Sequence, residues 1–106
     1  PEAYIFVEEM PEYPGGNKAL LEFIAKNLRY PSEALENNIE GRVILQFVVR
    51  EDGSVGRIEI LKGVDPLLNQ EAVRVVGSLP KLKPGKQNGV PVPVWFSVPV
   101  TFHLIY

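Results

Sequence analysis

The sequence predicts an α+β domain, in which a three-stranded antiparallel sheet carries two main helices on one face and has a long last strand at its edge. Three features indicate this fold. Two segments repeat apolar residues at helical spacing, two apolar segments flank an Asp-Gly turn, and the C-terminal segment alternates apolar and polar residues. A chain of 106 residues is long enough for one domain with a single core.

The chain divides into an extended N-terminal arm, residues 1–16, and a folded domain, residues 17–106. Proline and glycine recur in the arm. Its short apolar run, Ile5-Phe6-Val7, is compatible with an edge strand or with a segment docked on the domain. Because the chain begins at Pro1, we expect it to be processed or excised from a longer protein.

The first helix is expected to begin after an Asn17 cap and to end near Leu28, because Pro31 disfavours helical backbone at the residue before it. Its apolar positions are Leu20, Leu21, Ile24 and Leu28. A shorter helical segment over residues 32–37 follows, with Asn38 as the left-handed residue that ends it.

A later helix begins with Asp65 as its cap and Pro66 in its first turn, where the missing N–H of proline costs nothing. Gly77 and Pro80 end it. The stripe that it buries consists of Leu68, Ala72, Val75 and Val76.

Residues 43–50 and 54–62 are predicted to form a β-hairpin around the Asp52-Gly53 turn. A two-residue loop sets the register, and it places apolar residues of both strands on one face. The predicted pairs are Val49–Gly56, Phe47–Ile58 and Leu45–Ile60 on that face, with Gln46–Glu59 and Val48–Arg57 on the other.

The C-terminal segment is predicted to be one long strand over residues 92–105, because every even position from 92 to 104 is apolar. The backbone N–H and C=O groups of successive residues also alternate, pointing toward the neighbouring strand on one side and then on the other. Pro93 and Pro99 both occupy odd positions, so two N–H groups are missing from one side only. The strand is therefore expected at the edge of the sheet, with its odd-residue side open.

Composition excludes several functions. The chain has no Cys and one His, which excludes disulfides, thiolate chemistry and multi-His or Cys-containing metal sites, and no cofactor motif is present. A net charge of −2 argues against nucleic-acid binding. The lysines of residues 81–89 indicate a solvated loop more than a phosphate-binding patch. His103 and Ser97 lie roughly 20 Å apart along an extended strand, too far for catalysis. We interpret the chain as a non-enzyme.

The open strand edge is the predicted functional site, because unpaired main-chain groups accept an extended peptide as an additional strand. The candidate partner-binding residues are Trp95, Ser97, Thr101, His103 and Ile105. Trp95 is either a contact on the second face of the sheet or an exposed anchor for a partner. The alternative is an edge that proline blunts against pairing, and prolines can also limit where a partner pairs.

Several motifs occur in a specific order: Pro11-Glu12-Tyr13-Pro14-Gly15-Gly16, Tyr30-Pro31, Gly41-Arg42-Val43, Phe47-Val48-Val49, Asp52-Gly53-Ser54, Asp65-Pro66, Pro84-Gly85 and Pro99-Val100-Thr101-Phe102. Together they resemble the C-terminal domain family of TonB over nearly the whole chain from residue 11. The first motif and Gly63-Val64-Asp65-Pro66 resemble a branch with an extended N-terminal arm. The Ser-Ser-Gly turn of other members is missing near Gly63.

This resemblance implies the periplasmic domain of a protein anchored in the inner membrane of a Gram-negative bacterium. Members bind the TonB box, a short extended segment of outer-membrane transporters, along the last strand. Their N-terminal region, which is not part of this sequence, acts with ExbB and ExbD. Energy of the proton gradient then opens the transporter to siderophores or other nutrients. Two alternatives remain: a protein-binding tail of a membrane sensor or peptidase, and a strand-paired homodimer.

Overall fold

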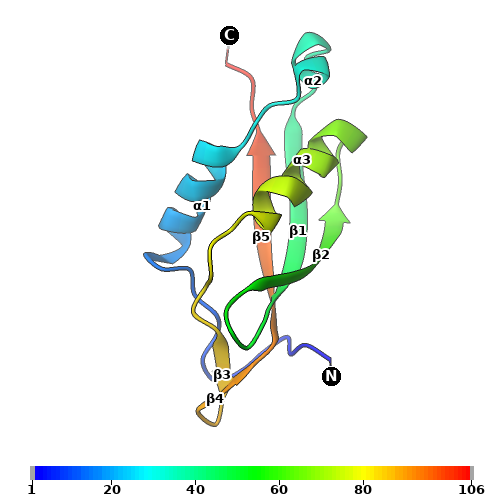
Figure 1. The fold of residues 1–106 in the computed structure, drawn as a ribbon. Helices are drawn as coiled ribbons and strands as arrows, with labels where there is room; N and C mark the ends of the chain where they lie inside the picture. The colour runs from blue at the N-terminus through cyan, green and yellow to red at the C-terminus, as the bar shows by residue number, and fades with distance from the viewer. Residues whose placement is uncertain (1, 106) are drawn as a thin grey trace.

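The computed structural model describes residues 2–105. Its elements are α1 (Gly16–Asn27), α2 (Ser32–Glu36), β1 (Gly41–Val49), β2 (Val55–Lys62), α3 (Pro66–Gly77), β3 (Gly85–Gln87), β4 (Val90–Val92) and β5 (Val94–Phe102). Strands β2, β1 and β5 form a three-stranded antiparallel sheet in that order, and α1 and α3 lie on one face of it (Figure 1). The predicted fold class is therefore confirmed, with β5 at the edge.

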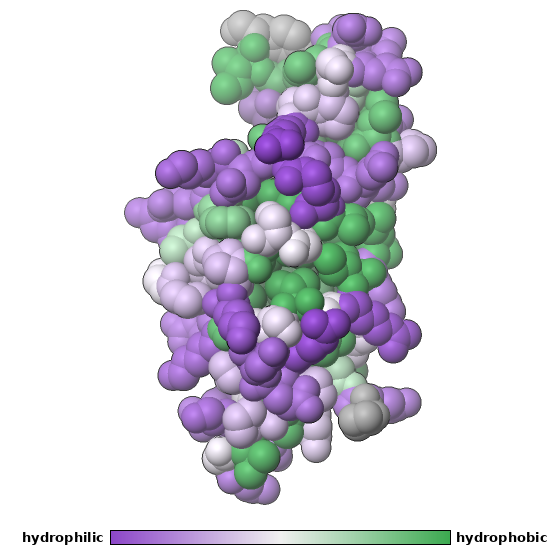
Figure 2. All heavy atoms as spheres, in the orientation of Figure 1, coloured by the Kyte–Doolittle hydropathy of each residue, from purple (hydrophilic) through white to green (hydrophobic). Residues whose placement is uncertain are grey.

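The core lies between the helices and one face of the sheet. Odd residues of β1 and even residues of β5 point into it, and the stripe predicted on α3 is fully buried. Leu20 and Ile24 of α1 belong to the same cluster. On the helix-bearing face, hydrophobic residues reach the surface mainly around the middle of the molecule, bordered by hydrophilic ones (Figure 2). Of the helices in residues 2–105, none combines the length and apolarity that a bilayer crossing requires.

The hairpin of β1 and β2 follows the predicted register only in the middle of its strands, between one register shift at Ile44/Leu45 and another at Phe47/Val48. The pairs Phe47–Ile58, Leu45–Ile60 and Gln46–Glu59 are confirmed. The pairs Val49–Gly56 and Val48–Arg57 are wrong, since Val49 pairs with Val55 and Val48 with Gly56. The shift nearer the turn lies beside Arg57, whose φ of 31° marks a bulge. The loop is longer than two residues, because the Arg50 amide donates to the Ser54 carbonyl.

The turn itself needs its glycine. Gly53 has a φ of 87°, and a Cβ built on it lies 2.0 Å from the carbonyl oxygen of Leu82. That carbonyl belongs to the segment after α3, whose Leu82 amide donates to the Gly53 carbonyl. The Asp-Gly signal thus serves a tertiary contact as well as the turn.

The ends of the helices follow the prediction in part. Asn17 is not the cap of α1: the helix begins at Gly16 after Gly15, which has a φ of 93°, and no side chain caps it. The Asp65 carboxylate does cap α3, accepting a hydrogen bond of 2.9 Å from the Leu67 amide. Asn38 is left-handed, with a φ of 53°, just after α2.

Residues 81–89 are more ordered than the predicted solvated loop. Strands β3 and β4 pair in a second, two-stranded sheet around Asn88-Gly89, both at positive φ. Asn-Gly is a strong signal for a tight hairpin turn, so the sequence did contain the information. This small sheet lies at the end of the molecule where the N-terminal arm runs (Figure 1).

Candidate peptide-binding edge

Strand β5 is shorter at both ends than the predicted strand over residues 92–105. It begins at Val94, because Pro93 separates it from β4, which pairs in the other sheet. It ends at Phe102, because Phe102 pairs with Gly41, the first residue of β1. Beyond Phe102 the chain has no residue of β1 with which to pair.

Odd residues of β5 direct their backbone polar groups away from β1. The Trp95 amide donates a hydrogen bond of 2.9 Å to the carbonyl of Tyr4, which lies on the outer side of β5. Because the direction alternates along a strand, Ser97 and Thr101 also face outward, while even residues bond to β1. Pro99 is odd, so its missing N–H leaves the ladder with β1 intact.

The outer side of β5 is occupied at one end by the protein's own arm. The Tyr4 amide donates a hydrogen bond of 2.8 Å to the Pro93 carbonyl. Together with the bond from the Trp95 amide it forms a parallel bridge. Further along the arm, Glu9 and Glu12 make isolated antiparallel bridges with the segment that contains β3. Val7, Pro11 and Tyr13 are buried. The arm is therefore docked on the domain by separated bridges.

The rest of this side is unpaired. Among residues 2–105, no main-chain hydrogen bond from outside the sheet reaches Ser97 or Thr101. The side chains of Ser97, Pro99 and Thr101 are exposed. We call residues 97–101 of β5 the open edge. It offers two N–H donors and the outward carbonyls between them, the groups that an added strand needs.

Trp95 lies next to the open edge and is engaged within the molecule. Its side chain is half-buried, and the guanidinium of Arg57 lies 5.8 Å from its ring centroid. Its amide is the one bonded to Tyr4. The structure thus places Trp95 against Arg57 on the outer face of the sheet, and its role toward a partner stays a prediction.

The remaining two candidates, His103 and Ile105, lie beyond the end of β5. His103 Nδ1 is 3.5 Å from Glu40 Oε1, and the same oxygen accepts a hydrogen bond of 2.8 Å from the Leu104 amide. Ile105 is 92% exposed. Within residues 2–105, no group of three or more acidic or His side chains could hold a metal ion.

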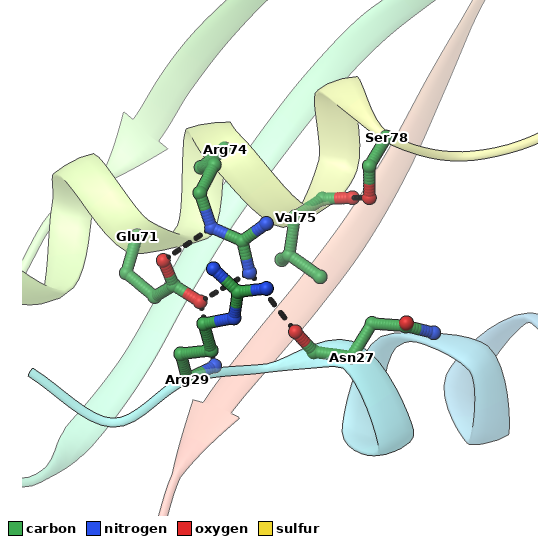
Figure 3. Close-up of polar contacts among 6 residues, drawn as sticks. All are labelled: Asn27, Arg29, Glu71, Arg74, Val75 and Ser78. Carbon is green, nitrogen blue, oxygen red and sulfur yellow. Dashed lines mark hydrogen bonds and ion pairs between the residues drawn. The ribbon is translucent and has the colours of Figure 1, made fainter.

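A polar cluster that the sequence reasoning missed joins α1 to α3 (Figure 3). Glu71 is buried, and its carboxylate accepts hydrogen bonds of 2.7 and 2.8 Å from Arg74 and of 2.6 Å from the Arg29 amide. Arg74 also donates to the carbonyl of Asn27, at the end of α1. These hydrogen bonds lower the pKa of Glu71, and those from Arg74 have the largest effect. Burial of the carboxyl group acts in the opposite direction.

The cluster matters because α1 forms one wall beside the open edge. A groove of about 140 Å³ lies between Asn17, Leu20 and Leu21 of α1 and residues 96–99 of β5. The only local signal in the sequence was the Glu71–Arg74 spacing of three residues on one helix. The partners on residues 27 and 29 come from tertiary packing.

Comparison with known proteins agrees with this fold. The family model described as Gram-negative bacterial TonB protein C-terminal matches residues 26–104. The chain belongs to this TonB family. Proteins of the family are energy transducers and not enzymes, so the family supports the prediction of a non-enzymatic domain.

Two similar relatives are the TonB proteins of Helicobacter pylori strains J99 and 26695, each 32% identical over 78 residues, or 71% of this chain. The chain spans 28% and 27% of their lengths. A solution NMR structure of the H. pylori TonB C-terminal domain, residues 194–285, has a TM-score of 0.63 and 26% identity, covering 81% of this chain and 90% of that one. The solution NMR structure of a longer form, residues 179–285, has a TM-score of 0.62 and 25% identity, covering 88% of this chain and 88% of that one.

Proposed function

We propose that this chain is the periplasmic domain of a TonB-type energy transducer and that it binds the TonB box of outer-membrane transporters at the open edge. In this proposal the box adds as a fourth strand beside β5. An inner-membrane anchor outside this chain, acting with ExbB and ExbD, then transmits energy of the proton gradient for nutrient uptake. The observation that carries the proposal is the run of outward main-chain groups without a partner at residues 97–101.

The distribution of hydrogen-bonding groups supports pairing through the main chain. The amides of Ser97 and Thr101 are the two donors, and Pro99 between them contributes only its carbonyl. An exposed row of this kind invites strand addition unless something covers it. We therefore centre the proposed site on Ser97 and Thr101. Trp95 flanks it, and His103 and Ile105 extend it only when the partner strand continues past the end of β5.

The test is titration of isotopically labelled domain with a synthetic peptide carrying the TonB box of an outer-membrane transporter, while backbone amides are followed. We expect the shifts to be largest at residues 97–101. Thr101→Pro removes one donor and is expected to weaken binding roughly tenfold. Thr101→Ala keeps the amide and serves as the matched control.

Two results would contradict the proposal: shifts confined to α2 or to the turn between β1 and β2, or equal affinities for the two Thr101 variants. Sedimentation at several concentrations separates the homodimer alternative. A dimer that the peptide cannot dissociate would assign the open edge to a second copy of this chain.

A further inference from the structure

A cavity beside the open edge is lined jointly by the arm and the sheet. It measures about 470 Å³, and its lining consists of Ile5 and Met10 of the arm, Gln46 of β1, and Trp95, Phe96 and Ser97 of β5. None of these side chains is charged. We infer that this arm pocket receives an apolar side chain of the segment that pairs with the open edge, so that the arm is part of the binding site. The inference rests on the proposed function.

The backbone of the arm holds two apolar side chains exposed at this place. Ile5 is 75% exposed and Met10 is 43% exposed. Ile5 follows Tyr4, which is bonded to β5, and Met10 follows Glu9, whose amide and carbonyl both bond to Lys86. Main-chain bonds therefore fix both positions without burying the side chains. Apolar surface held exposed in this way is typical of a binding surface.

The occupant is identified by the position of the pocket relative to Ser97. Ser97 lines the pocket and also carries the first free donor of the open edge. A strand bonded there projects successive side chains to opposite faces of the sheet. Gln46, Trp95 and Ser97 share the outer face, so the side chain of the added strand that points to this face beside Ser97 enters the arm pocket. An uncharged lining favours an apolar group, since a charge would lose its hydration there.

The neighbouring side chain of the same strand meets a different surface. On the helix side of β5 it faces the groove beside α1, whose volume of about 140 Å³ is much smaller than that of the arm pocket. The bound segment is therefore expected to place a large apolar residue next to a small one near Ser97. The partner is thus an extended segment of another protein with this pair of residues.

The experiment compares two sets of arm variants in the titration with the TonB-box peptide. The double variant Ile5→Ser/Met10→Ser removes the two apolar side chains that the arm contributes to the pocket, and we expect affinity to fall about tenfold. Phe6→Ser is the matched control: Phe6 is 83% exposed and lies on the arm, but it does not line the pocket. Affinity of the control is expected to equal that of the unaltered domain. All replaced side chains are exposed, and the amide spectrum without peptide verifies that each variant is folded.

The outcomes separate this inference from the proposed function. If the peptide fails to shift the amides of Ser97 and Thr101 in the unaltered domain, both fail. If those shifts occur and the double variant binds as tightly as the control, only the arm pocket is refuted. Tighter binding by the double variant would also refute it, because the arm would then act as a competitor. Concentration-dependent shifts at Ser97 without peptide would assign the pocket to a second copy.

Discussion

The two ends of the outer side of β5 differ although they belong to one strand with one alternating pattern. At Pro93 and Trp95 the outward main-chain groups bond to Tyr4 of the arm, whereas at Ser97 and Thr101 no described residue bonds to them. An unpaired edge promotes unwanted association, and proteins usually cover it. Here the cover extends over one end only. The difference shows that the arm limits the length of the unpaired edge to a defined stretch, residues 97–101, where we propose that a partner binds.

The two walls beside the open edge also differ in how they are held. The arm is held by isolated main-chain bridges at Tyr4, Glu9 and Glu12 and by buried side chains, of which Tyr13 reaches the core. Helix α1 contributes Leu20 and Ile24 to the core and is joined to α3 through the Glu71 cluster. We therefore expect α1 to be the firmer wall, since it buries two residues in the core and charge-assisted hydrogen bonds add to the stability of its position.

The largest expected effect distinguishes the inner side of β5 from its outer side. Val100→Pro removes an amide that faces β1 and is expected to destabilise the domain by about 3 kcal/mol or more. Thr101→Pro, one residue away, removes an outward amide and is expected to cost less than about 1 kcal/mol. Urea unfolding measures both. Equal losses for the two variants would show that the assignment of inner and outer sides is wrong.

A smaller effect is expected for the cluster that holds α1. Glu71→Gln weakens the hydrogen bonds from Arg74 and is expected to lower the free energy of unfolding by about 1–2 kcal/mol. Glu36→Gln, at an exposed position on α2, is the control and is expected to change it by less than about 0.5 kcal/mol. A Glu71 variant as stable as the control would mean that the cluster does not position α1.

The same cluster predicts a pH dependence. The pKa of Glu71 is lowered in the folded state, so its carboxylate stabilises the fold fully above the ordinary glutamate pKa of about 4.3. This contribution is lost as the pH falls through the lower, folded-state value. The difference in stability between the unaltered domain and Glu71→Gln should therefore shrink on acidification, as denaturant unfolding at several pH values would measure. A difference that grows below pH 4 would contradict this account.

The sequence was sufficient for those features that depend on local patterns. Alternation along residues 94–102 and the odd positions of Pro93 and Pro99 predicted an edge strand and its outward side. It was insufficient where the outcome depends on a distant neighbour. The end of β5 at Phe102 follows from the start of β1, and the bridge from Tyr4 joins residues about ninety positions apart. The arm pocket could not be predicted for the same reason, because no local pattern around Ile5 or Met10 indicates that they lie beside Ser97.

Amide hydrogen exchange tests the central claim most directly. In the domain alone, Trp95 should be protected by its bond to Tyr4, while the amides of Ser97 and Thr101 should exchange like those of an exposed backbone. Addition of the TonB-box peptide should slow exchange at Ser97 and Thr101 and leave that of Trp95 unchanged. Protection of Ser97 and Thr101 in the monomeric domain before any peptide is added would contradict the account, because the open edge would already be paired.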